Sequence, residues 1–275
     1  MIERLRRHID FFPGEVRLFA KNLQSGAQVG IGEHEPVRTA STIKLPIMAA
    51  LFHEVARGRA RWDERLRLRD SDKVSGSGVL HEFSDGVELP LRDVMHLMIV
   101  VSDNTATNLI LDRITADAVN AYLDTLGLTR TRSMRKVRGD GSQLKEASGW
   151  SKAGLLEENK RFGLGSSTSW EMVALLEKLH RGEIVSPEAS REMLAILGRQ
   201  QYKDCIGRYL GRYRVMSKSG SLDALRSDAG IVVTPRGPIA MAMTVDGMPW
   251  VDYTPENPGL ALLGRLAEIL AEDLS

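Results

Sequence analysis

Two residues near the start of the chain have the types and spacing needed for serine acyl transfer. A serine hydroxyl is a weak nucleophile until a base removes its proton. Lys44 lies three residues after Ser41, so a helical segment places both side chains on one face. Burial and a second cation can lower the pKa of an amine enough for it to act as that base, and Lys218 offers such a cation. The pattern predicts Ser41 as nucleophile and Lys44 as its base.

Two further motifs, Ser102-Asp103-Asn104 and Lys218-Ser219-Gly220, supply the other groups that such a reaction needs. The Ser102 hydroxyl can pass a proton to a leaving nitrogen, and the Asn104 amide can orient a substrate. We expect Asp103 to hold its loop by accepting backbone N–H groups. Lys218 adds a cation, Ser219 can bind a substrate carboxylate, and Gly220 allows the backbone to approach a ligand closely. Acyl transfer therefore has a candidate residue for each role.

The order of the motifs selects Ser41 among three Ser-x-x-Lys sequences. The other two begin at Ser133 and Ser142, after Ser102, and we expect these serines to be ordinary surface residues. Taken singly, Ser41 could be a helix N-cap and the Ser102 motif a capping turn. The ordered set of three motifs favours the catalytic interpretation.

The periodicity of apolar residues predicts strands at both ends of the chain and helices between them. Alternation predicts strands near 16–20 and 27–31, around 213–220, and at 230–233 and 239–245. Four-residue spacing and capping residues predict helices at 2–10, 42–57, 91–101, 105–114, 117–126, 169–181, 187–197 and 260–270. Residues 60–90 and 129–165 read mostly as loop. Pairing of the terminal strands would give one antiparallel sheet with the helical middle as an insertion.

Composition excludes several classes of function. The chain has 275 residues and a net charge of +1, which disfavours nucleic-acid and anionic-membrane partners. A single cysteine excludes an intrachain disulfide, and the six histidines form no metal-binding motif, so we expect no metal and no cofactor. The N-terminal residues do not resemble a signal peptide. We expect a monomeric cytoplasmic protein that acts on a small molecule; a periplasmic or secreted protein whose signal peptide is missing is the alternative.

The three motifs, in this order, resemble those of class A β-lactamases and penicillin-binding proteins. The resemblance extends from about residue 12 to the C-terminus. It implies an α/β (α+β) fold, with a five-stranded antiparallel sheet and flanking terminal helices at 1–36 and 205–275. Residues 37–204 would form an all-helical subdomain, with the site in the cleft between. The resemblance also implies an oxyanion hole made of the backbone N–H groups of Ser41 and Ser221.

One position departs from the family pattern. Class A β-lactamases carry a glutamate that activates the water that releases the acyl-enzyme, and Val137 falls about where that residue is expected. Glu157 or Glu158 could fold back and replace it. The sequence therefore supports acylation better than deacylation.

The resemblance implies a serine hydrolase that is acylated at Ser41 and hydrolyses the amide of β-lactams. A D-Ala-D-Ala carboxypeptidase or small-ester esterase on the same fold is one alternative, and a glutaminase-like amidase is a weaker one. A penicillin-binding sensor or pseudoenzyme that stays acylated is the non-enzymatic alternative. Kinetics with a chromogenic cephalosporin separate hydrolysis from persistent acylation.

Overall fold

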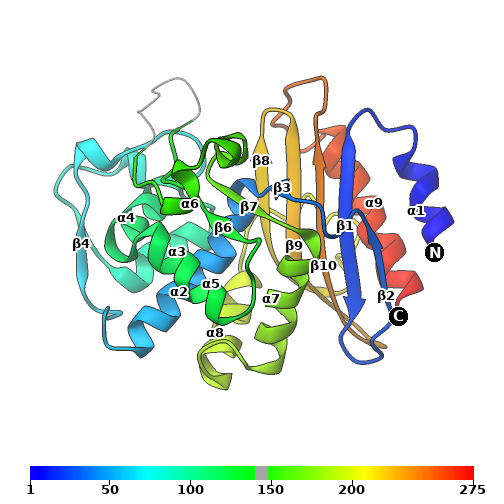
Figure 1. Cartoon of the computed structure of the whole chain (residues 1–275), viewed down its shortest axis with the longest axis horizontal. Coiled ribbons are helices and arrows are strands. Elements are labelled where there is room, and N and C mark those ends of the chain that lie inside the picture. Colours follow the sequence, from blue (N-terminus) through cyan, green and yellow to red (C-terminus); the bar gives the residue numbers. More distant parts are fainter. Residues whose placement is uncertain (140–147) are drawn as a thin grey trace.

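A five-stranded antiparallel sheet lies between two groups of helices in the computed structural model, which describes residues 1–139 and 148–275 (Figure 1). Its strands are β1 (Glu15–Asn22), β2 (Gln28–Ile31), β8 (Arg214–Leu222), β9 (Leu225–Thr234) and β10 (Gly237–Asp246). Their order is β2-β1-β10-β9-β8, so an N-terminal strand pairs with a C-terminal strand. β8 lies at the edge of the sheet, where every second backbone N–H points away from β9.

Helices from the two chain ends lie side by side over one face of the sheet (Figure 1). They are α1 (Ile2–Ile9) and α9 (Pro258–Asp273). The N-cap of α9 is Asn257, whose side-chain oxygen accepts the Gly259 N–H at 2.8 Å. Leu5 and Leu266 are fully buried in the shared core, and burial of such a side chain contributes about 1.5–3 kcal/mol.

The opposite face of the sheet meets the helical region. α7 (Ser169–Arg181) packs against β1 and β10. The other helices are α2 (Lys44–Ala56), α3 (Leu91–Val100), α4 (Asn104–Ile114), α5 (Ala116–Thr125), α6 (Lys152–Leu155) and α8 (Pro187–Leu197). The first nine residues of α2 are all buried, so this part of the helix is enclosed on every side.

Short elements connect the helices. The strands β3 (Val37–Arg38), β7 (Gly165–Ser167) and β6 (Arg132–Ser133) form one small sheet, and β4 (Arg65–Arg67) pairs with β5 (Glu88–Pro90). The 3-10 turns are η1 (Ala40–Ile43), η2 (Asp70–Asp72), η3 (Leu80–Glu82) and η4 (Glu157–Phe162). The region expected to be all-helical thus also contains short strands, which are too brief to show a two-residue period in the sequence.

The predicted architecture is confirmed: one antiparallel sheet draws strands from both chain ends, with helices between them. The helices expected at 169–181 and 187–197 coincide with α7 and α8. The division of the chain after residues 36 and 204 stays a prediction. In the described part of the chain, no helix has both the length and the apolar composition required to cross a bilayer.

Candidate active site

Ser41 lies in the η1 turn, which runs directly into α2. The Lys44 N–H donates to the Ser41 carbonyl, and residues three apart eclipse each other in a 3-10 turn. The side chains of Ser41 and Lys44 therefore project to the same side. Ser41 is half-buried and Lys44 is completely buried. The hydroxyl thus remains accessible while the amine lies in the interior.

Three oxygen atoms surround the amine of Lys44. Its Nζ lies 2.6 Å from the backbone oxygen of Ser102, 2.9 Å from Asn104 Oδ1 and 3.1 Å from Ser102 Oγ. Burial holds the pKa of Lys44 well below its ordinary value; the positive charge of Lys218 lowers it further, and Asp103 opposes the shift. A neutral amine has two N–H groups that can donate to the surrounding oxygens of Ser102 and Asn104, and one lone pair that can accept a proton. This arrangement suits a general base.

The Ser102 motif forms the turn between α3 and α4. Asp103 caps α4: its Oδ1 accepts the Ala106 N–H at 2.8 Å, and its Oδ2 accepts those of Val79 and Leu80 at 2.6 and 2.8 Å. The expectation that Asp103 holds its loop through backbone donors is confirmed. The same turn directs both Ser102 and Asn104 toward Lys44.

Lys218 extends from β8, and its Nζ lies 2.8 Å from the Ser219 carbonyl oxygen and 3.2 Å from Gln200 Oε1. No carboxylate in the described part of the chain forms an ion pair with it. Burial lowers the pKa of Lys218 to about 7, although the negative charge of Asp228 opposes this shift. Lys218 is therefore a fully buried amine that changes charge near neutrality.

β8 passes very close to the nucleophile turn at Gly220. A Cβ atom at this position would lie 2.8 Å from the Ser41 nitrogen and 2.9 Å from the Thr39 oxygen, so a side chain cannot fit. The Ser219 N–H donates to Gln200 at 3.0 Å and so points away from β9. Because backbone directions alternate along a strand, the Ser221 N–H points to the same outer side. This direction is the one required for the oxyanion donor that the family resemblance implies.

Two non-glycine residues of the site have left-handed backbone conformations. Ala40 has a φ of 48° next to Ser41, and Ser102 has a φ of 55°. Positive φ angles are uncommon in residues other than glycine. They concentrate at functional sites, where the surrounding contacts hold the backbone in place. Thr39 provides part of this support, because its carbonyl accepts hydrogen bonds from the Ser227 hydroxyl at 3.0 Å and the Thr42 hydroxyl at 2.7 Å.

Val137 is fixed to α4 one turn beyond Asn104. Its N–H donates to Asn108 Oδ1 at 2.7 Å, and its carbonyl accepts from Asn108 Nδ2 at 3.0 Å. The Val137 side chain is half-buried. Val137 is therefore held against α4, the helix that begins at Asn104. Its aliphatic side chain cannot take a proton.

The two alternative carboxylates lie in η4 and are exposed. Glu157 pairs with Lys160, and the Glu158 carboxylate makes no hydrogen bond or ion pair with any other described residue. Neither carboxylate contacts Ser41, Lys44, Ser102 or Lys218. A role for either residue in deacylation stays a prediction.

Of the two rejected serines, Ser142 lies outside the described residues, and the expectation for Ser133 was wrong. Ser133 is completely buried: its N–H donates to Asn120 Oδ1 at 2.8 Å and its carbonyl accepts from Asn120 Nδ2 at 2.9 Å. Its position in β6 explains the burial, because this short strand pairs with β7. Ser133 therefore has a structural role.

Sequence reasoning missed three residues that support the site: Gln200, Asp228 and Asn108. Gln200 and Asp228 occur in no recognisable motif, and their contacts depend on how α8 and β9 meet β8. Asn108 follows Asn104 by four residues on a predicted helix, and this spacing could have indicated a shared face. Within the described residues, no group of three or more His, Cys, Asp or Glu side chains could hold a metal ion.

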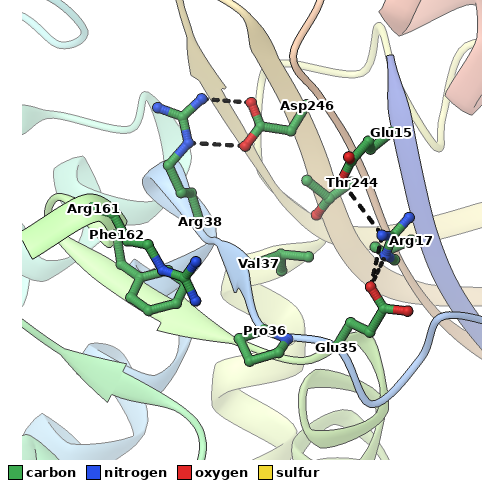
Figure 2. A pocket seen from close by; sticks show the side chains of 10 residues that line it. All are labelled: Glu15, Arg17, Glu35, Pro36, Val37, Arg38, Arg161, Phe162, Thr244 and Asp246. Atoms are coloured by element: carbon green, nitrogen blue, oxygen red, sulfur yellow. Dashed lines mark hydrogen bonds and ion pairs between the residues drawn. The ribbon is translucent and has the colours of Figure 1, made fainter. Parts of the chain in front are cut away.

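A cavity of about 470 Å³ lies beside β1, β3 and β10, and none of the motif residues lines it (Figure 2). Three ion pairs join residues on its walls. Arg38 Nε lies 2.8 Å from Asp246 Oδ2, Arg17 Nε lies 2.7 Å from Glu35 Oε2, and Arg17 also pairs with Glu15 at 3.4 Å. Arg38 precedes Ser41 by three residues, so its pair with Asp246 ties the segment leading into η1 to β10. The cavity wall thus helps to fix the nucleophile turn.

The antiparallel sheet, the helical region and the Ser–Lys pair between them define a serine hydrolase with a β-lactamase/transpeptidase-like fold. Comparison with known proteins agrees with this assignment. The sequence profile of the β-lactamase enzyme family matches residues 1–274. The chain therefore belongs to the β-lactamase enzyme family.

Individual relatives support this assignment. The chain is 28% identical to β-lactamase L2 of Stenotrophomonas maltophilia over 265 residues, which cover 90% of this chain and 78% of that protein. It is 30% identical to a β-lactamase of Sphaerobacter thermophilus, with a TM-score of 0.82 and coverage of 100% and 97% of the two chains. It is 26% identical to PBP-A, whose L158E mutant was solved as an acyl-enzyme with penicillin G; the TM-score is 0.81, with coverage of 98% and 94%.

Proposed function

We propose that this protein hydrolyses β-lactams through an acyl-enzyme on Ser41 and releases the acyl group slowly. The buried Lys44 amine, held against Ser102 and Asn104 one turn after Ser41, is the observation that carries this proposal. A β-lactam substrate also agrees with the family to which the chain belongs and with the penicillin complex of PBP-A.

In the acylation step, neutral Lys44 removes the Ser41 proton as Oγ bonds to the lactam carbonyl carbon. The carbonyl oxygen gains negative charge, which the backbone N–H groups of Ser41 and Ser221 stabilise; one such donor is worth about 3 kcal/mol. The C–N bond then breaks and the ring nitrogen takes a proton from Ser102. Ser102 in turn recovers one from Lys44, so the amine returns to its neutral form.

Substrate binding uses β8 and the Ser102 turn. The Lys218 ammonium and the Ser219 hydroxyl bind the carboxylate of the substrate, and Asn104 donates to its side-chain amide carbonyl. One hydrogen of the Asn104 amide is engaged by the Ser75 carbonyl at 3.1 Å, which leaves the second for this contact.

Release of the acyl group requires a base that activates water. Val137 offers none, and the exposed positions of Glu157 and Glu158 give no support to either as a substitute. We therefore expect deacylation, and not acylation, to limit turnover.

Stopped-flow kinetics with a chromogenic cephalosporin test the proposal. A burst equal to the enzyme concentration, followed by slower steady turnover, is the expected result. A burst with no subsequent turnover would favour a penicillin-binding sensor. No reaction with β-lactams but cleavage of acyl-D-Ala-D-Ala or small esters would favour the peptidase or esterase alternative.

A further inference from the structure

Gln200 follows α8 and lies against the open edge of β8. It is only 3% exposed, and its amide contacts three successive strand residues. Its Oε1 lies 3.2 Å from Lys218 Nζ, 3.0 Å from the Ser219 nitrogen and 3.3 Å from Ser219 Oγ, while its Nε2 lies 3.2 Å from Ser217 Oγ. One buried side chain thus contacts both residues proposed to bind the carboxylate of the substrate.

The backbone fixes the orientation of this amide. A backbone N–H can only donate, so the Gln200 atom that faces the Ser219 nitrogen must be the oxygen. Nε2 then donates to Ser217 Oγ, and the Ser217 hydroxyl directs its own proton to Asp228 Oδ2 at 3.4 Å. In this series of hydrogen bonds, each donor points from the substrate side toward Asp228. The Gln200 carbonyl dipole is therefore aimed at Lys218.

Asp228 ends the chain of hydrogen bonds in the interior. It is 1% exposed, its Oδ2 also accepts the Ile206 N–H at 3.1 Å, and its Oδ1 has no partner among the described residues. Burial raises the pKa of Asp228 to about 6, so this carboxyl group is mostly ionised at neutral pH. A buried carboxylate behind the edge strand thus polarises the Ser217–Gln200 chain.

We propose that Gln200 is a positioning residue that holds Lys218 as an ammonium ion and Ser219 in place for a substrate carboxylate, with Asp228 fixing its orientation through Ser217. This inference rests on the proposed function, because it assigns a role in binding carboxylate-bearing β-lactams. Gln200 touches neither the nucleophile nor the reacting atoms, and it acts through Lys218 and Ser219.

Other charged groups also act on this region. Lys44 on α2 repels Lys218, and Asp103 in the Ser102 turn lies near Lys44. Asp228 on β9 attracts Lys218, and the buried, neutral thiol of Cys205 lies beside Asp228. The test therefore has to distinguish loss of the Gln200 acceptor from a general change in the electrostatics of the site.

Gln200→Leu removes the acceptor, and Gln201→Leu is the matched control, because the neighbouring Gln201 side chain is exposed. We expect Gln200→Leu to lower the second-order rate of acylation by benzylpenicillin by roughly 10- to 100-fold, the value of a hydrogen bond to a charged group. Affinity for an aryl boronic acid that lacks a carboxylate should be unchanged. The acylation rate of Gln200→Leu should also fall at lower pH than that of the wild type on the alkaline side of its pH profile, because Lys218 loses its proton more easily without the acceptor. Asp228→Asn should move this alkaline limb in the same direction.

Equal rates and equal alkaline limbs for Gln200→Leu, Gln201→Leu and the wild type would overturn the inference. If Gln200→Leu does not fold, Gln200→Glu retains the acceptor and adds a charge, so its alkaline limb should move to higher pH; an unmoved limb would again overturn the inference. A wild type that binds the boronate but is not acylated by penicillin would contradict the proposed function instead. In that case, ¹⁵N-lysine NMR still reports whether Gln200→Leu lowers the pKa of Lys218.

Discussion

Val137→Glu is expected to convert slow release of the acyl group into fast turnover. Two hydrogen bonds fix the Val137 backbone to Asn108, at 2.7 and 3.0 Å. Asn108 lies four residues, or about 6 Å along the helix axis, from Asn104, whose oxygen is 2.9 Å from Lys44 Nζ. A carboxylate at position 137 would therefore be held within about one helical turn of the reacting groups.

The size of the effect follows from the chemistry that the side chain adds. A positioned general base accelerates a step by roughly 10² to 10⁴, which corresponds to about 2.7–5.5 kcal/mol of barrier. Val137 is half-buried, so the new carboxylate keeps contact with water and the loss of stability should stay within about 1 kcal/mol. The acyl-enzyme lifetime should shorten by the full factor while the acylation rate is retained.

Quenched-flow mass spectrometry of the acyl-enzyme, with steady-state hydrolysis measured in parallel, gives both rates. Val137→Gln is the control, because it has nearly the same shape as the glutamate variant but cannot take a proton at neutral pH. A folded Val137→Glu protein with wild-type acylation and an unchanged acyl-enzyme lifetime would refute the reasoning about this position.

Three further results are expected. Lys44→Met should slow acylation by roughly 10² to 10⁴ in stopped-flow measurements, since it removes the general base; a wild-type rate would contradict that role. Lys218→Ala removes a cation that lowers the pKa of Lys44, so that pKa should rise. Because Lys44 acts when neutral, the acid limb of the acylation profile should then move to higher pH, and an unmoved limb would mean that the two amines are not coupled. Glu157→Gln and Glu158→Gln should each leave the acyl-enzyme lifetime unchanged, because both side chains are exposed; a longer lifetime would identify the base.

Much of the fold could be predicted because its pattern is local. Ser186 and Pro187 begin α8 and Gly198 follows its last residue, so the bounds of this helix can be read from the sequence. The nucleophile and its base are also close in sequence, and helical geometry alone brings Ser41 and Lys44 to one side.

Features that depend on contacts distant in sequence could not be predicted. Gln200 lies in an unremarkable Arg-Gln-Gln run, and its importance comes from an outward-facing N–H of β8 that no sequence pattern reveals. Burial of Ser133 depends on Asn120 and on pairing with β7. The left-handed conformation of Ala40, in the turn that β8 approaches closely at Gly220, likewise cannot be read from an alanine.

Ser41 is expected to form a covalent acyl-enzyme that is made quickly and lost slowly. Intact-mass spectrometry at increasing times after mixing with benzylpenicillin tests it directly, with peptide mapping of the adduct. We predict a single adduct with the full mass of the drug, located on Ser41, that outlasts the acylation phase and is absent from Ser41→Ala. An adduct on Ser133 or Ser142, or no adduct while the drug is hydrolysed in a burst-free steady state, would contradict the claim.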